Sequence, residues 1–317
     1  MSSVDFSTVP VAGKEGLLII VEGNISAGKT TLCMELSKQL GCQVFLEPTL
    51  TNPYLADFYQ DPARWGLKMQ LWLLRQRFCT YIDSVLHALR TGQSVVLDRS
   101  VYSDWVFAEN SRSDGTISPE GFEYYLAIRS QMISRLPPPH IAVFLDVEPQ
   151  ECHRRIHDVR KRDCESGIPV EYLAGLHRCY HLFVEDLRER GSCVLRYDWN
   201  GFGSTPAIAA DIRANMSSTA ALSLELHEFL ADKQAINEAM MPSSFELMTL
   251  ARHFEDTDRV FDFLTSFTAS ADETALLLQE SPSKRQRSTP PASCSAHSSD
   301  VIVEPMGLTK RVVFSVI

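Results

Sequence analysis

The chain has 317 residues, more than one compact α/β domain usually needs, so we expect one sizeable domain followed by a tail or a small second domain. Forty acidic against thirty basic residues give a net charge of −10, which opposes binding to a nucleic-acid polymer but still allows a local positive cluster to hold a small anion. No run of eighteen or more apolar residues occurs, which argues against a membrane span.

The N-terminal residues and the cysteines indicate an intracellular protein. The opening MSSVDFSTVPVAGKEG has neither the apolar core of a secretory signal nor the Arg-rich amphipathic pattern of a mitochondrial address. The eight cysteines form no C-x-x-C pair and most lie in apolar segments, so we expect reduced structural thiols. We therefore predict a cytoplasmic location and favour a mitochondrial one less, with residues 1–14 as a flexible N terminus; only the KRQR considered below raises a nuclear location.

The segment VEGNISAGKTTL, residues 21–32, has the spacing Gly23-x-x-x-x-Gly28-Lys29-Thr30 directly behind an apolar run. Such glycines let backbone N–H groups surround an anion, the lysine reaches the outer phosphates, and the threonine hydroxyl ligates magnesium. A chance glycine turn is the alternative, but a strand before the loop and an amphipathic helix over 29–40 after it favour nucleotide binding. The predicted phosphate-binding residues are Gly23, Asn24, Ile25, Ser26, Ala27, Gly28, Lys29, Thr30 and Thr31.

Strand-like runs alternate with helical patterns over residues 15–232. The runs are GLLIIVEG, CQVFLE, SVVLDRS, HIAVFLD and SCVLRYD. This alternation is typical of an α/β fold with a five-stranded parallel sheet flanked by helices. The carboxyl ends of the strands should line one edge, where ligands bind in open α/β sheets.

Two further segments allow more than one interpretation. The segment 64–90 is predicted to form a long helix with apolar residues on more than one face, which fits either core burial or burial against a partner subunit. Residues 233–317 should form a C-terminal extension that is partly helical and, in its Ser- and Pro-rich part, disordered. The KRQR there fits a nuclear address or a phosphorylation-regulated patch, but an ordinary solvated charge run is favoured.

Polar residues follow the second and third strands. Glu47 lies in FLEP, and Asp98, Arg99 and Ser100 lie in LDRS. If the γ-phosphate of ATP lies over the glycine-rich loop, a carboxylate there accepts a proton from an attacking hydroxyl, and an arginine stabilises the transferred charge. A structural Glu–Arg ion pair is the better interpretation of either residue alone, but beside such a loop the catalytic interpretation is favoured.

The segment HRRIHDVRKRDCESG, residues 153–167, is dense in basic side chains and precedes a helix that begins near Pro169. This density is typical of a mobile lid that closes over phosphates and excludes water. Asp158 and Asp163 partly neutralise it, so a solvated charged face is the alternative. Its place after the strand HIAVFLD favours the lid.

Two histidine pairs, His153–His157 and His177–His181, have the i, i+4 spacing of zinc ligands on a helix. Neither pair has the glutamate of an H-E-x-x-H site. We therefore interpret all four as residues of helix faces.

These motifs together resemble the deoxyribonucleoside kinases over most of residues 16–200. The resemblance rests on EGNISAGKTT, on EP after the second strand, on FYQDPARWGLKMQ, on LDRSVYSD and on GIPVEYLAGLH. It implies a P-loop kinase fold with an Arg-rich lid, and a homodimer. It also implies ATP or another nucleoside triphosphate as phosphate donor, Mg²⁺, and a small deoxynucleoside as acceptor.

The resemblance also implies roles for individual residues. Glu47 would be the general base for the sugar 5′-hydroxyl, Arg99 would stabilise the phosphoryl group, and Asp98 would lie near the magnesium with Thr30. The nucleoside would be bound by Tyr59 and Glu165 at the 3′-hydroxyl, Gln70 at the base edge and Phe107 by stacking. The lid arginines would be Arg155, Arg160 and Arg162, and the loop 197–203 would face the adenine of ATP.

Arg77 and Asp104 suggest which base is accepted. Arg77 lies two helical turns beyond Gln70, and Asp104 follows RSVYS on the opposing segment. A guanidinium paired with a carboxylate requires a polar base edge and fills the space that a thymine methyl needs. In the resembled family this pair accompanies deoxycytidine and purine deoxynucleoside kinases, so we expect deoxyadenosine, deoxyguanosine or deoxycytidine to be preferred over thymidine.

Two other functions stay open. A nucleoside monophosphate kinase of the thymidylate kinase type shares the P-loop, EP and DR, but its EP normally leads into glycines, whereas here the sequence is EPTLTNP. A non-catalytic scaffold subunit is the second, although a scaffold has no physical need for Lys29, Thr30, Glu47 and Arg99 together.

Overall fold

The computed structural model describes residues 16–47, 54, 57–58, 61–161 and 167–216. The strands are β1 (Leu18–Gly23), β2 (Gln43–Phe45), β3 (Val95–Asp98), β4 (Ile141–Asp146) and β5 (Cys193–Asp198). The helices are α1 (Lys29–Leu40), α3 (Pro62–Thr91), α4 (Asp104–Ser113), α5 (Pro119–Ile133), α6 (Pro149–Arg155), the π-helical turn η2 (Ile156–Arg160), α7 (Val170–Glu189) and α8 (Thr205–Asn215). Each strand lies within one of the five runs predicted from the sequence.

The strands form one sheet in the order β2-β3-β1-β4-β5, and all neighbouring pairs are parallel. The predicted five-stranded parallel sheet is therefore confirmed. β1 is central and completely buried. Its residue Val21 pairs with Asp98 at the end of β3, and Gly23 pairs with Leu145 near the end of β4. The loop that follows β1 consequently leaves the sheet between the carboxyl ends of two other strands.

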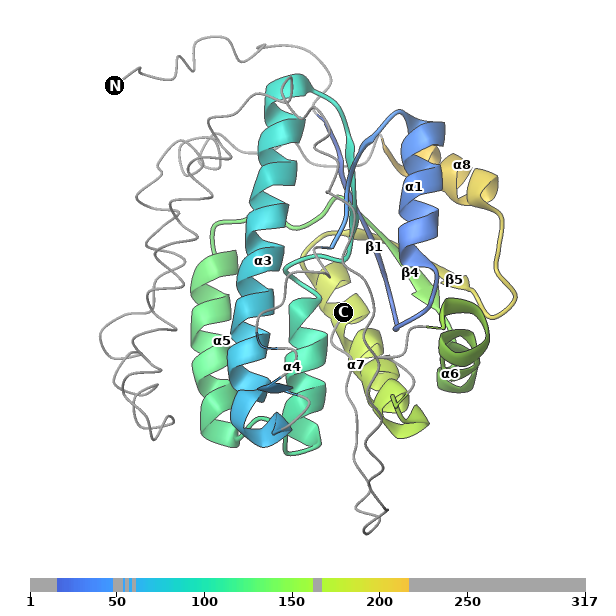
Figure 1. Cartoon of the computed structure of the whole chain (residues 1–317). Coiled ribbons are helices and arrows are strands. Elements are labelled where there is room, and N and C mark those ends of the chain that lie inside the picture. Colours follow the sequence, from blue (N-terminus) through green and yellow to red (C-terminus); the bar gives the residue numbers. More distant parts are fainter. Residues whose placement is uncertain (1–15, 48–53, 55–56, 59–60, 162–166, 217–317) are drawn as a thin grey trace, which may run out of the picture.

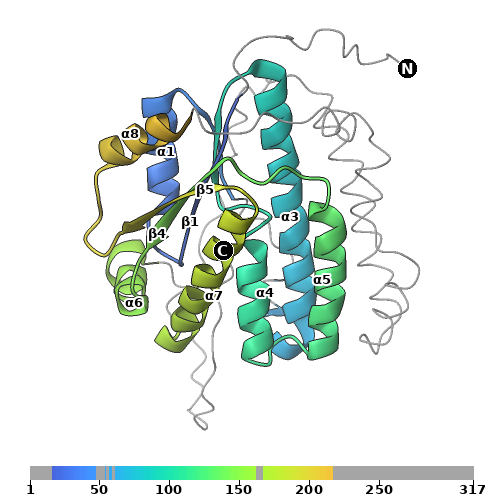
Figure 2. The same ribbon diagram turned by 180° about the vertical axis from the view of Figure 1, so that it is seen from behind.

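Helices cover both faces of this sheet (Figures 1 and 2). On one face lie α1 and α8, which contact each other. On the other face lie α3 and α7, with α4 packed against both of them and α5 against α3 and α4. The inner strands β1, β3 and β4 are buried almost throughout and can therefore be apolar on both sides.

Local sequence explains where several helices begin and end. Gly28 and Gly41 flank α1 with left-handed backbone, which glycine adopts at little cost. The carboxylate of Asp61 caps α3 by accepting the Arg64 N–H at 3.2 Å, and Pro62 supplies a first residue that needs no N–H partner. The helix therefore begins two residues before the predicted segment 64–90 and ends one residue after it.

Burial within the chain accounts for both apolar faces of α3. One face, with Leu71, Leu74 and Phe78, belongs to the main core. The other contributes Met69 and Leu73 to a second, smaller cluster. Core burial therefore explains the pattern, and the homodimer stays a prediction.

None of the helices within the described ranges is long and apolar enough to cross a membrane. The predicted flexible residues 1–14, the extension 233–317 and its KRQR lie outside the described residues and stay predictions.

Gly175 in α7 offers a test of how closely α7 packs on α4. A Cβ at this position would lie 1.9 Å from Oδ1 of Asn110, so Gly175→Ala requires that side chain to move. Alanine is the better helix former by about 1 kcal/mol, but overpacking costs about 1–3 kcal/mol. We expect a net loss of about 1 kcal/mol in the free energy of unfolding, measured by urea denaturation.

The matched control is Gly201→Ala, where nothing lies within 4 Å of the added carbon and we expect a change within about 0.5 kcal/mol. Combining Gly175→Ala with Asn110→Ala should recover the loss, because the clashing atom is gone. A Gly175→Ala cost that is unchanged in the Asn110→Ala background would contradict the packing seen here.

Candidate active site

The loop between β1 and α1 requires backbone conformations that few side chains adopt. Gly23 has a φ of 150°, and a Cβ there would lie 2.7 Å from the carbonyl oxygen of Leu145. Gly28 has a φ of 98°, and Ser26 has a φ of 62° although it carries a side chain. Both glycines of the sequence motif are thus needed for backbone geometry. The left-handed Ser26 stores strain of a kind that is concentrated at functional sites.

Asn24 and Lys29 tie this loop together. Asn24 is buried, and its side-chain Oδ1 accepts the Ile25 N–H at 2.8 Å. Its Nδ2 donates to the carbonyl of Leu173 in α7 at 2.9 Å. Lys29 Nζ donates to the Asn24 carbonyl at 2.7 Å, which holds the ammonium over the loop. The arrangement supplies a positive charge and a helix N-terminus at one point, as an anion site requires.

Arg155, the last residue of α6, fastens a second loop to this one. It is 1% exposed and donates to the carbonyls of Ala27 at 3.2 Å, Trp199 at 2.6 Å and Asn200 at 2.9 Å. Its guanidinium carbon also lies 3.9 Å from the centre of the Phe202 ring. The sequence predicted a lid arginine, whereas here Arg155 is a buried support of the P-loop, and its contact with phosphate stays a prediction.

Thr30 and Asp98 meet at the predicted magnesium position. The Thr30 hydroxyl, in the first turn of α1, donates to the carboxylate of Asp98 at the end of β3. A hydroxyl and a carboxylate at the mouth of the loop are oxygen donors of the type Mg²⁺ prefers. The residues present therefore fit that ion.

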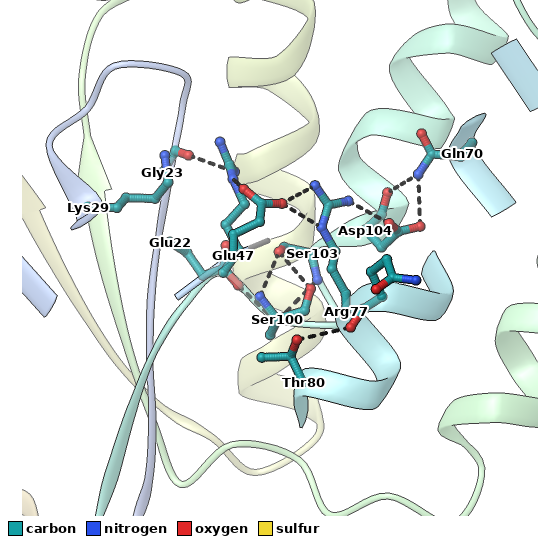
Figure 3. A network of polar contacts seen from close by, with 12 residues as sticks. Glu22, Gly23, Lys29, Glu47, Gln70, Arg77, Thr80, Ser100, Ser103 and Asp104 are labelled. Carbon is teal, nitrogen blue, oxygen red and sulfur yellow. Dashed lines mark hydrogen bonds and ion pairs between the residues drawn. The ribbon is translucent and has the colours of Figure 1, made fainter. Parts of the chain in front are cut away.

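Glu47, Arg77, Asp104 and Gln70 form one chain of polar contacts (Figure 3). Arg77 donates to Glu47 Oε1 from Nε at 2.9 Å and from Nη2 at 2.5 Å. Its Nη1 reaches Asp104 Oδ1 at 2.5 Å. Gln70 Nε2 donates to Asp104 Oδ2 at 2.8 Å. The predicted Arg77–Asp104 pair is present, and the tie from Arg77 to Glu47 was not predicted.

The charges around Glu47 keep it ionised. Burial alone would raise the pKa of Glu47, but Arg77 and then Arg99 outweigh that effect and hold the pKa below its usual value. Arg99 Nε lies 3.2 Å from Glu47 Oε2, close enough for an ion pair but without the alignment of a hydrogen bond. A small pocket lies directly beside Glu47, Asp98 and Arg99. An ionised carboxylate and a guanidinium thus flank one opening.

Arg99 is held in a strained position. It has a φ of 68°, and its N–H donates to the Val21 carbonyl at 3.1 Å. Its Nη1 donates to the Gly23 carbonyl at 3.2 Å and contacts the hydroxyl of Tyr180 in α7. A left-handed arginine persists only where surrounding contacts impose it.

The ring of Phe107 lies against both buried guanidiniums. The guanidinium carbons of Arg77 and Arg99 are 4.9 and 4.8 Å from the centre of its ring. The ring therefore contributes cation–π attraction that holds both arginines. Its predicted stacking on a base stays a prediction.

Several predicted residues lie outside the described part of the chain. They are Tyr59, Arg162 and Glu165, together with the side chain of Arg160. Their roles, and closure of a lid, stay predictions.

Sequence reasoning missed Glu22, a fully buried carboxylic acid next to Gly23. Its Oε1 accepts the Ser100 hydroxyl at 2.8 Å, and its Oε2 has no hydrogen-bond partner. Burial raises the pKa of Glu22 to about 7, against the smaller lowering effect of Arg99. A charged residue inside the buried run LLIIVEG was the available signal, because such residues are rarely buried without a partner.

Glu22→Gln tests this raised pKa. Below pH 4.5 the carboxyl is neutral in both folded and unfolded chains, so the amide should match it. Between pH 4.5 and pH 7 the Glu22 carboxyl ionises in the unfolded chain but stays neutral in the folded one. The free energy of unfolding of the wild type therefore falls over this range, whereas that of the variant does not. The variant should therefore be the more stable by under about 1 kcal/mol at pH 5 and by on the order of 3 kcal/mol at pH 8.

The measurement is urea unfolding of both proteins at the two pH values. Glu109→Gln, at a partly exposed carboxylate, should follow the wild-type pH profile. Parallel profiles for wild type and Glu22→Gln would mean that Glu22 has an ordinary pKa.

Comparison with known proteins shows which family the chain resembles. The deoxynucleoside kinase family model matches residues 19–228. A deoxyguanosine kinase of Dictyostelium discoideum is 52% identical over 195 residues, covering 62% of this chain and 68% of the relative. A deoxyadenosine kinase of the same organism is 34% identical over 204 residues, covering 64% and 81%. A Bos taurus protein named NADH dehydrogenase [ubiquinone] 1 alpha subcomplex subunit 10, mitochondrial, is 32% identical over 202 residues, covering 57% and 58%.

Solved structures agree on the fold. Deoxyadenosine kinase from M. mycoides with products dCMP and dCDP superposes with a TM-score of 0.54 at 24% identity, covering 63% of this chain and 98% of that one. The same enzyme with bound dATP gives a TM-score of 0.52 at 23% identity, covering 62% and 97%. At this identity the likeness concerns the fold alone. Since the family model spans more than half of the chain, and a deoxyguanosine kinase and a deoxyadenosine kinase are 52% and 34% identical to it, the chain belongs to the deoxynucleoside kinase family.

Proposed function

We propose that this enzyme transfers the γ-phosphoryl group of ATP, or of another nucleoside triphosphate, to the 5′-hydroxyl of a deoxynucleoside for nucleotide salvage. The observation that carries the proposal is the buried, ionised Glu47, which lies between Arg77 and Arg99 at the sheet edge that also bears the P-loop. A carboxylate and a cation in this relation serve one chemistry well, namely proton removal from a hydroxyl as negative charge develops beside it.

The donor triphosphate belongs to the P-loop side. The N-terminus of α1 and the Lys29 ammonium provide positive potential there, and Thr30 with Asp98 would hold Mg²⁺. When bound, that ion neutralises charge on the phosphate oxygens. The loop that carries Trp199 and Phe202 borders the P-loop, which fits its predicted place beside the adenine.

The acceptor belongs to the Glu47 side. A 5′-hydroxyl in the opening beside Glu47 would pass its proton to a carboxylate oxygen as its own oxygen attacks phosphorus. Arg77 and Arg99 keep Glu47 ionised at neutral pH, so the base is available without prior deprotonation. Arg99 contacts both the Gly23 carbonyl of the P-loop and Glu47, so its charge would stabilise the phosphoryl group as it is transferred.

Purine deoxynucleosides and deoxycytidine are the proposed acceptors, in preference to thymidine. Asp104 is completely buried and accepts from Arg77, Gln70 and the Tyr125 hydroxyl. These contacts fix the Gln70 amide with its nitrogen toward Asp104, which leaves its oxygen to accept from a base edge. The names of the two Dictyostelium relatives, a deoxyguanosine kinase and a deoxyadenosine kinase, support a purine preference. The homodimer and the cytoplasmic or nuclear location are carried over from the sequence as part of the proposal.

Two alternatives are tested with it. A thymidylate kinase-type enzyme would phosphorylate nucleoside monophosphates, and a scaffold relative would phosphorylate nothing. The likeness to a subunit named for NADH dehydrogenase motivates the second alternative. Lys29, Thr30, Glu47 and Arg99 are all present and mutually arranged, which a scaffold does not need.

The first experiment supplies magnesium, labelled ATP and a mixture of deoxynucleosides and their monophosphates. We expect label on deoxynucleosides. Glu47→Gln keeps the side-chain shape and removes its basicity, so the turnover number should fall on the order of 10²–10⁴-fold while ATP affinity is retained. Glu109→Gln is the matched carboxyl-to-amide control and should retain wild-type turnover. Near-normal turnover of Glu47→Gln would move the general base elsewhere, and label on monophosphates alone would favour the thymidylate kinase type.

The second experiment changes both members of the buried pair, Arg77→Met with Asp104→Ala, because removing one alone leaves an uncompensated charge. The wild type should prefer deoxyguanosine or deoxyadenosine over thymidine. Since Arg77 also supports Glu47, the double variant should lose turnover on every substrate. The measured quantity is therefore the ratio of kcat/KM for thymidine to that for deoxyguanosine, which should rise at least about tenfold, an amount equal to about 1.4 kcal/mol. An unchanged ratio would show that the pair does not select the base.

A further inference from the structure

A cluster of three metal-ligand side chains lies outside the proposed active site. Asp146 ends β4, and His177 and His181 are one turn apart on α7. His177 Nε2 is 2.9 Å from Asp146 Oδ1, His181 Nε2 is 3.5 Å from the same oxygen, and the two Nε2 atoms are 3.1 Å apart. All three ligand atoms therefore lie within 3.5 Å of one another.

The triangle has the size of one face of a metal coordination shell. Zinc lies about 2.0–2.1 Å from imidazole nitrogen and carboxylate oxygen, so two ligand atoms are about 3.0 Å apart at a right angle and about 3.4 Å apart at the tetrahedral angle. The three separations observed here, 2.9, 3.1 and 3.5 Å, cover that range. No side chain has to move far to coordinate an ion.

Hydrogen bonds cannot satisfy the three contacts among these atoms at the same time. Asp146 Oδ1 lies 2.9 Å from His177 Nε2, and its Oδ2 already accepts two hydrogen bonds from Arg196. A proton on His177 Nε2 can point to the Asp146 oxygen or to the His181 nitrogen, but not to both. A cation accepts a lone pair from each of the three atoms at once.

The surroundings favour a transition metal over Mg²⁺ or Ca²⁺. Arg196 binds the other carboxylate oxygen of Asp146, with Nε at 2.9 Å and Nη2 at 2.5 Å, which directs Oδ1 toward the histidines and offsets the carboxylate charge. The affinity must then come from the two imidazoles, and imidazole suits zinc, copper and nickel, whereas hard cations prefer oxygen. His177 and His181 are partly exposed, at 20% and 35%, so an ion can enter from solvent.

We propose that Asp146, His177 and His181 bind a divalent transition-metal ion of the zinc class, which joins the end of β4 to α7. The sequence interpretation of this pair as a helix face rested on the lack of a glutamate within the helical motif. The carboxylate comes instead from a strand 31 residues earlier in the chain. The pair His153–His157 has the same spacing and close rings, but within the described residues no cluster of three candidate ligands includes it.

The test uses the full chain, stripped with EDTA and titrated with ZnCl₂ by calorimetry in a large excess of MgCl₂, which occupies oxygen sites. We expect one equivalent of zinc to bind the wild type. His181→Ala and His177→Ala should each lose that equivalent, or weaken it at least about 100-fold, because two ligands seldom hold zinc. The matched control, His153→Ala with His157→Ala, should bind as the wild type does.

A second readout does not depend on variants. Co²⁺ added to the stripped wild type should give the intense visible bands of four- or five-coordinate cobalt, absent from His181→Ala, and zinc should abolish them. Far-UV circular dichroism of each stripped variant checks that it is folded. The proposal is overturned if the wild type binds no zinc in excess magnesium. It is equally overturned if the His177 and His181 variants bind as the wild type does, since the ion would then be held elsewhere, for example by cysteines.

Discussion

The proposed acceptor side of the site depends on the buried guanidinium of Arg77, which is paired with two carboxylates from different parts of the chain. Its Nε and Nη2 hold Glu47 beyond the end of β2, and its Nη1 holds Asp104 at the start of α4. Removing one partner of such a buried pair typically costs about 3–5 kcal/mol, because the remaining charge stays out of water. The position of α3 relative to the sheet edge is therefore fixed by charge as well as by apolar packing.

Arg99 joins that acceptor network to the P-loop. It lies beside Glu47 on one side and donates to the Gly23 carbonyl on the other. Its left-handed backbone is unfavourable in isolation, and the Val21 carbonyl, the Tyr180 hydroxyl and the Phe107 ring hold it there. A positive charge that is already in position favours phosphoryl transfer, because it need not move when negative charge develops in the transition state.

Helix α7 contacts both the P-loop and Arg99. Leu173 accepts the side chain of Asn24 in the P-loop, Tyr180 contacts Arg99, and Gly175 allows close approach of α4. His177 and His181 add a link from the same helix to the end of β4. A change in the position of α7 would therefore reach the phosphate loop and the arginine together, and an ion bound between Asp146 and the histidines would restrain it.

Local spacing in the sequence was sufficient to predict the P-loop, the five parallel strands and the placement of Glu47 and Arg99 at the sheet edge. These features depend on residues close in the chain, or on the rule that parallel strands present their carboxyl ends together. The tie from Arg77 to Glu47 bridges 30 residues, and the contact of Asp146 with His177 bridges 31. Glu22 was missed because its neighbours in space, Ser100 and Arg99, come from the segment directly after β3.

What the sequence determined by itself is the set of chemical groups and the edge at which they gather, since turn geometry and strand periodicity act over a few residues. Only the tertiary structure decided which groups are paired. The strand order β2-β3-β1-β4-β5 and the packing of α3 and α7 bring together charges that no periodic pattern relates. Because a buried charge is stable only with its partner, those pairings determine that Glu47 is ionised while the nearby Glu22, with one oxygen unpaired, has a pKa near 7.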